Sequence, residues 1–165
     1  MEIQKEYRKG AIGALMDEYE RATLELKRVI ESVTDSEFER IVDKETSDES
    51  CRSIQTIAGH VVIAGYAYAN YIREQFKIST TASQDGLLSR SQSLIKLNEI
   101  LTYTEQTLEG RWLMSEQAIS SIVIKTRWGV TYDLEQLLEH AIVHILRHRR
   151  QIEKFIAQQR NMAES

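Results

Sequence analysis

The sequence contains no proline, one cysteine and seven glycines among its 165 residues. Proline breaks helix interiors, so its absence permits long uninterrupted helices. The lone Cys51 excludes an intramolecular disulfide and a thiolate zinc cluster. No apolar run approaches the ~20 residues needed to span a bilayer, and the N-terminus lacks the apolar core of a signal peptide. We therefore expect a soluble, cytoplasmic, helical protein that does not enter a membrane.

The charge balance is mildly acidic, with 21 Lys and Arg against 25 Asp and Glu, which gives a formal charge of −4. Nucleic-acid binding favours a basic face, so we expect no nucleic-acid partner. A content of 42% hydrophobic and 28% charged residues excludes wholesale disorder. No linker or repeat interrupts the chain, and residues 1–165 are expected to form a single domain.

Apolar residues recur at three- and four-residue steps over four segments, which predicts four amphipathic helices. These segments are residues 5–33, 51–76, 87–113 and 133–158. Thr34 and Glu37 have the spacing of a capping box and predict a short helical turn, while residues 43–50 and 79–83 read as loops.

The stretch between Ile119 and Tyr132 is rich in β-branched and aromatic residues, including Ile122, Val123 and Trp128. This composition predicts a short extended or hairpin-like connection before the last helix. The predicted fold is therefore all-α, an up-down four-helix bundle with one short extended segment.

Three of the four histidines, His140, His144 and His148, lie four residues apart in the last predicted helix. A helical wheel places His148 and then His144 closest to the apolar stripe, and His140 furthest from it. His60 flanks the stripe of the second helix, beside the small residues Ala64 and Ala67. These positions predict a metal site made by His60, His144 and His148. The alternative is a set of structural histidines on a polar helix face.

Three neutral imidazoles suit zinc, nickel or ferrous iron, whereas calcium and magnesium prefer oxygen ligands. Three protein ligands also leave a coordination position open, which is typical of a catalytic site. Such an ion activates a water molecule or a thiol, so no further catalytic side chain is required by the pattern.

The segment His144-x-x-x-His148-Arg149-x-Gln151-Ile152 resembles the motif that closes the last helix of the DinB-like (YfiT-like) family. The residues around Glu18–Glu20 and Leu26–Arg28 are similar to the first helix of that family, and Ile54 to Val62 to its second. Trp128-Gly129 before the final helix is also similar, so the resemblance covers most of the chain.

The resemblance implies a four-helix bundle, often a homodimer, with a divalent metal on His60, His144 and His148. His140 has no counterpart in that triad, and Arg150 stands where the family commonly has a small residue. Members with assigned activity include S-transferases that use bacillithiol or mycothiol and a maleylpyruvate isomerase, which implies a low-molecular-weight thiol as cosubstrate.

Several other residues are candidates for a small-molecule substrate site. Gln151 lies on the histidine face and is a candidate for substrate binding, as is the hydroxyl of Tyr71 near His60. Arg147, Arg149 and Arg150 form a basic run suited to an anionic cosubstrate or, alternatively, to the C-terminal end of the helix dipole. Cys51 has no histidine beside it in sequence and is expected to be unreactive.

Two functions of different class remain open. The first is a metal-dependent enzyme, a thiol S-transferase or a hydrolase, and the second is a non-catalytic stress-response or binding bundle with a structural or vestigial metal site. A histidine phosphotransfer bundle is disfavoured because His60 is followed by Val61, Val62 and Ile63 and not by the basic residue common in such domains.

Overall fold

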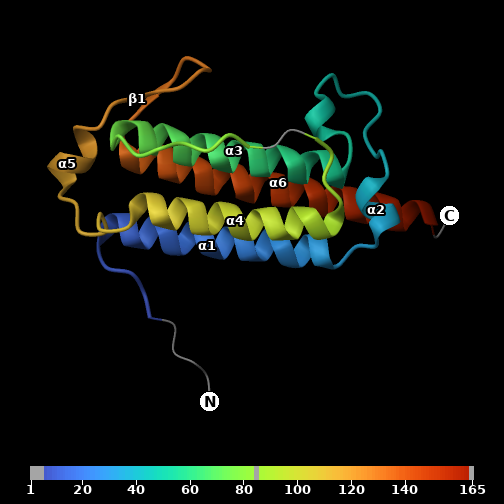
Figure 1. Ribbon diagram of the computed structural model, residues 1–165. Helices are drawn as coiled ribbons and strands as arrows, with labels where there is room; N and C mark the ends of the chain where they lie inside the picture. The colour runs from blue at the N-terminus through green and yellow to red at the C-terminus, as the bar shows by residue number, and fades with distance from the viewer. Residues whose placement is uncertain (1–5, 84–85, 164–165) are drawn as a thin grey trace.

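Four long helices form the body of the protein in the computed structural model, which describes residues 6–83 and 86–163. They are α1 (Gly10–Glu31), α3 (Ile54–Gln75), α4 (Arg90–Leu108) and α6 (Leu134–Ala163), packed side by side (Figure 1). α1 contacts α4 and α6, and α3 contacts the same two helices, so the four enclose a shared core. The predicted all-α four-helix bundle is confirmed.

Short elements occupy the connections. They are α2 (Asp35–Glu39), the 3₁₀ turn η1 (Glu49–Cys51), α5 (Glu116–Ser120), β1 (Ile124–Lys125) and β2 (Thr131–Tyr132). The two strands pair antiparallel, with Ile124 opposite Tyr132, which confirms the predicted hairpin before the last helix. Gly129 in its turn has a φ of +86°, a conformation that favours glycine. The sequence pattern did not predict α5.

Serine caps set two of the helix starts. The hydroxyl of Ser53 accepts a hydrogen bond from the backbone N–H of Thr56, so α3 begins at Ile54 and not near Cys51 as predicted. Ser89 caps α4 in the same way, which moves its start from the predicted residue 87 to Arg90. Side-chain oxygens of this kind satisfy backbone N–H groups that have no partner within the helix.

Other boundaries also differ from the predicted ones by a few residues. The predicted start of the first helix at Lys5 lies outside the described residues, and the structure begins α1 at Gly10. Residues 6–9 do not continue the helix, and the backbone N–H of Arg8 donates instead to the carboxylate of Asp17. α4 ends at Leu108 and not at 113, and α6 continues to Ala163. The capping box of Thr34 and Glu37 is present as predicted.

The helix directions differ from the expected up-down alternation. α3 and α4 run in the same direction, and α1 and α6 run in the opposite one (Figure 1). The connection between α3 and α4 returns along α3 from its end to its beginning. Arg73 and Asn70 near the end of α3 bond the carbonyls of Ser79 and Thr81, and Gln55 near its start bonds that of Leu88. Side chains of one helix face thus fix this long crossover.

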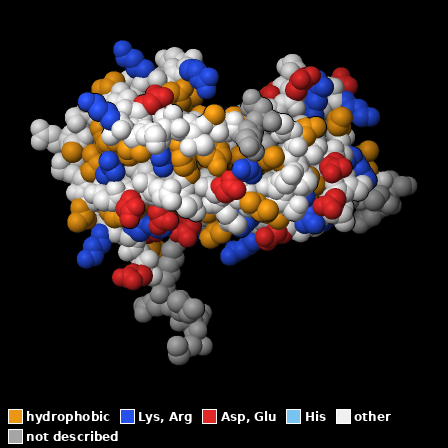
Figure 2. Space-filling model, in the orientation of Figure 1, with side chains coloured by type: hydrophobic (Ala, Val, Ile, Leu, Met, Phe, Trp, Pro, Cys, Tyr) orange, Lys and Arg blue, Asp and Glu red, His pale blue; other side chains and the backbone are white. Residues whose placement is uncertain are grey.

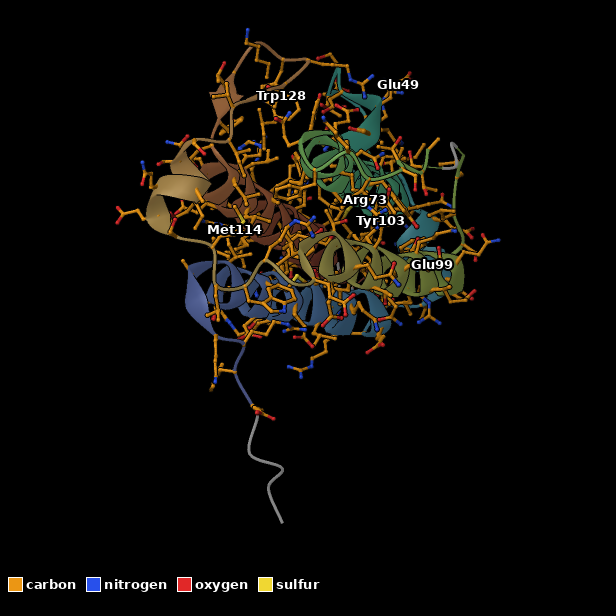
Figure 3. All side chains as sticks on the ribbon, turned by 60° about the vertical axis from the view of Figure 1, so that its left-hand side comes forward. Glu49, Arg73, Glu99, Tyr103, Met114 and Trp128 are labelled. Atoms are coloured by element: carbon orange, nitrogen blue, oxygen red, sulfur yellow. The ribbon has the colours of Figure 1, made fainter. Side chains whose placement is uncertain are left out.

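Arg73 links three parts of the bundle and lies beside Tyr103 of α4 (Figure 3). Its Nε donates to the Thr107 hydroxyl at 2.7 Å, its Nη1 donates to the Ser79 carbonyl at 2.9 Å, and its guanidinium stacks 3.8 Å from the Tyr103 ring centroid. A buried cation needs such partners because its desolvation is costly.

The outer surface mixes acidic and basic side chains over the face drawn in Figure 2, in keeping with the near balance of charge. Among the described residues, no helix combines the length and apolar character needed to cross a membrane.

Candidate metal centre

Three histidines from two helices meet inside the bundle. His60 lies on α3, and His144 and His148 lie one turn apart on α6, a spacing that puts both imidazoles on one helix face. The Nε2 atoms of His60 and His144 are 3.0 Å apart, and one ligand nitrogen from each of the three rings lies within 4.8 Å of the others. The structure therefore brings together the three residues that the sequence singled out, in an arrangement that fits a metal-binding site.

The three rings are partly withdrawn from solvent, and His148 is only 3% exposed. Burial and then the neighbouring His148 and His60 lower the pKa of His144 to about 3. Burial, followed by His60, also lowers the pKa of His148, and burial lowers the pKa of His60. All three imidazoles are thus neutral at pH 7, the protonation state in which imidazole binds a metal.

Gln151 fixes the orientation of His148. The Nδ1–H of His148 donates to the amide oxygen of Gln151 at 3.0 Å, which leaves the Nε2 of that ring as its free ligand atom. A hydrogen bond of this type to the second ring nitrogen sets the tautomer of a metal-binding histidine. Gln151 also lines a cavity of about 670 Å³ together with Lys154, Phe155 and Gln158, so it contacts both His148 and open space.

The turn before α3 carries a carboxylate whose charge acts on the histidines. Asp48 accepts hydrogen bonds from the backbone N–H and hydroxyl of Ser50, and its carboxylate opposes the burial-driven fall in the pKa of His60 and of His148. Burial raises the pKa of Cys51, so its thiol is protonated at neutral pH. This protonation agrees with the expectation of an unreactive thiol.

His140 lies outside the triad, within a cluster of aromatic rings. Its ring stacks on Trp128 at a centroid distance of 5.8 Å, its Nδ1 lies 3.3 Å from the Tyr132 hydroxyl, and Tyr68 packs edge-on against it. The helical wheel placed His140 towards solvent, and the structure covers it because the hairpin folds over this end of α6 (Figure 3).

Tyr71 is placed at the hairpin. Its hydroxyl accepts a hydrogen bond from the backbone N–H of Arg127 at 2.9 Å, and its ring contacts Trp128. The residue therefore anchors the hairpin to α3, and contact of Tyr71 with a substrate stays a prediction.

Tyr68 was not among the residues that the sequence singled out. The Tyr68 ring packs edge-on against His144 at a centroid distance of 5.6 Å. Its position eight residues after His60 puts both side chains on one face of α3, and this spacing was a usable signal. Asp48 was also missed, because its proximity to the histidines depends on the path of a loop.

Comparison with protein families identifies the family of this chain. The model of the DinB family matches residues 7–159, nearly the whole length. No curated protein gives a significant match. The family match includes α1, α3, α4, most of α6 and the three clustered histidines, and the chain belongs to the DinB family.

Proposed function

We propose that this protein is a metal-dependent enzyme in which His60, His144 and His148 hold a divalent zinc, nickel or ferrous ion. The observation that carries the proposal is the convergence of three neutral imidazoles, with the Nε2 atoms of His60 and His144 3.0 Å apart. Two nitrogens that bind one zinc ion at about 2.0–2.1 Å in a tetrahedral arrangement are separated by roughly 3.3 Å. The nitrogens of His60 and His144 are thus close to the spacing that such an ion requires, and a ring nitrogen of His148 lies within 4.8 Å of them.

With three protein ligands and an open position, the ion would act as a Lewis acid that lowers the pKa of a bound thiol or water. The residues around it have separate tasks. Gln151 holds the His148 ring and leaves its Nε2 free for the ion, and the low pKa of His144 keeps protons from competing for the site. The packed rings of Tyr68 and His140 shield one side from bulk water.

The reaction class that we propose is thiol S-transfer or hydrolysis on a small-molecule substrate, with a low-molecular-weight thiol as cosubstrate in the first case. The support is the combination of family membership with an open three-histidine site. We further propose that the protein acts as a homodimer in the cytoplasm, as the resemblance and the sequence composition suggest.

Elemental analysis of the purified protein tests the metal site. We expect one divalent ion per chain in the wild type and a large loss of metal in His144→Ala. His140→Ala is the matched control, because it removes an imidazole one turn away on the same helix and should keep the ion. Wild-type protein that remains substoichiometric after loading with zinc, nickel and ferrous iron would overturn the proposal.

A second measurement separates the enzyme from a non-catalytic bundle. The enzyme predicts turnover in a screen of thiol transfer and ester or amide hydrolysis that is lost on chelation and in His144→Ala. A structural site instead predicts a large fall in the melting temperature on chelation, with no turnover in the metal-loaded protein.

A further inference from the structure

The basic run of α6 divides into residues with different surroundings. Arg149 is engaged in ion pairs with Glu25 of α1 and with Glu153 one turn along α6. Arg147, in contrast, makes no hydrogen bond or ion pair within residues 6–83 and 86–163. The three arginines therefore do not act as one cationic patch, and Arg147 keeps its guanidinium available for a ligand.

Arg147 lies on the same side of α6 as the candidate metal centre. It follows His144 by three residues and precedes Gln151 by four, spacings at which side chains of a helix are neighbours, with Cβ atoms roughly 5–6 Å apart. Arg147 is therefore a neighbour on α6 both of one candidate ligand, His144, and of the residue that orients another, Gln151.

Tyr68 supplies a second polar group at the same place. The side chain is 8% exposed and packs edge-on against His144, yet its hydroxyl has no hydrogen-bond partner in the described part of the chain. Tyr68 and Arg147 thus both neighbour His144, Tyr68 through its ring contact from α3 and Arg147 from one turn further along α6. The phenol hydroxyl is therefore available to donate a hydrogen bond to a ligand oxygen.

We propose that Arg147 and Tyr68 form a carboxylate-binding subsite beside the three histidines. The guanidinium donates two parallel N–H bonds to the carboxylate oxygens, and the phenol donates a third hydrogen bond. The inference rests on the proposed metal site and specifies its ligand: a small molecule with a carboxylate a few bonds from the thiol or other group that meets the ion.

The charges around the site favour a carboxylate over a phosphate. Both anions match the geometry of a guanidinium, but a phosphomonoester carries a charge close to −2 at neutral pH and usually meets more than one cation. Here the negative charge of Asp48 acts on His60 and His148 and disfavours a second negative charge at the site. A monoanion with a single cation partner is the better fit.

Thiol binding to cobalt-loaded protein tests the subsite without any assay of turnover. The probe is mercaptobutyrate, whose carboxylate is too far from the sulfur to close a small chelate ring on the same ion, and its neutral reference is mercaptobutyramide. Thiolate-to-cobalt absorption reports binding of either compound. We expect the wild type to bind the acid at least about tenfold more tightly than the amide, since hydrogen bonds to charged groups are the strong ones.

Substitutions assign this preference to the residues. Arg147→Met should abolish the difference between acid and amide, Arg147→Lys should restore part of it, and Tyr68→Phe should reduce it severalfold. Arg150→Met is the matched control, because it removes an exposed arginine of the same helix and should leave the preference intact.

The outcomes separate this inference from the metal site on which it rests. If the wild type and Arg147→Met both bind cobalt and show the same preference for the acid, the subsite is overturned and the metal site stands. Stronger competition by inorganic phosphate than by acetate would also overturn it. A wild type that takes up no cobalt would overturn both.

Discussion

His148 and Gln151 form a hydrogen-bonded pair, with the ring Nδ1–H donating to the amide oxygen at 3.0 Å. The pair spans one turn of α6, so the helix itself presents the acceptor to the ring. This arrangement resembles the outer-shell partners that orient metal-binding histidines in proteins generally. The sequence assigned Gln151 to substrate binding, and its contact with His148 adds a role in positioning a ligand ring.

Loss of the Gln151 amide should weaken metal binding. In Gln151→Ala the His148 ring loses its acceptor and is free to rotate or change tautomer, and removal of such a partner typically costs about 10–100-fold in metal affinity. Competition with a chromophoric chelator measures this change. Gln158→Ala is the matched control, since Gln158 lines the same cavity two turns further along α6. Equal affinities in the two variants would show that the hydrogen bond has no influence on the ion.

Acid should destabilise the metal-free protein through the histidine cluster. The pKa of His144 is about 3 in the folded protein against an ordinary value of 6.5, so the unfolded chain binds the extra proton between these two values. Stability is therefore present above about pH 6.5 and falls as the pH is lowered, with a slope of at most about 1.4 kcal/mol per pH unit for each proton taken up on unfolding. Urea denaturation at several pH values measures the slope.

The matched variant for this experiment is His144→Gln, which cannot titrate. We expect a shallower dependence on pH in the variant between pH 7 and pH 4. His148 and His60 contribute in the same direction, because burial lowers the pKa of both. Parallel curves for the wild type and the variant would contradict the assignment of this effect to His144.

The histidine triad was predictable because its geometry is mostly local. A four-residue step on one helix fixes His144 relative to His148, and amphipathic periodicity directs His60 of a second helix towards the same core. The hairpin before α6 was likewise visible in its β-branched composition. These features depend on neighbours in sequence.

Features that depend on tertiary partners were not predictable. Arg147 and Arg149 are the same residue type, two positions apart in the sequence. Arg149 is paired because Glu25 of another helix lies beside it, and the sequence does not show this. His140 was placed at the surface because a helical wheel has no information about the hairpin that covers it. The parallel order of α3 and α4 similarly follows from a crossover held by side chains such as Arg73.

Removal of the Arg73 guanidinium should destabilise the bundle. Arg73→Met deletes the hydrogen bonds to Thr107 and Ser79 while it keeps much of the side-chain volume, and charged hydrogen bonds of this kind together contribute about 2–4 kcal/mol to the free energy of unfolding. Thermal and urea denaturation measure the loss. Arg21→Met is the control: Arg21 pairs with Glu18 on the exposed surface of α1, where an ion pair contributes little. A similar loss in the two variants would refute a special role for Arg73.

The hairpin should loosen when its anchor on α3 is removed. Tyr71→Phe deletes the acceptor for the backbone N–H of Arg127 but retains the ring against Trp128. In a Trp112→Phe background, Trp128 is the remaining tryptophan, and it is already 47% exposed. We expect Tyr71→Phe to shift its emission to the red and to increase quenching by acrylamide, while metal content stays at the wild-type level. Tyr66→Phe removes a hydroxyl of the same helix that bonds Glu99, away from the hairpin, and should change neither signal. Unchanged emission in Tyr71→Phe would mean that ring packing with Trp128 and His140 holds the hairpin without this hydrogen bond.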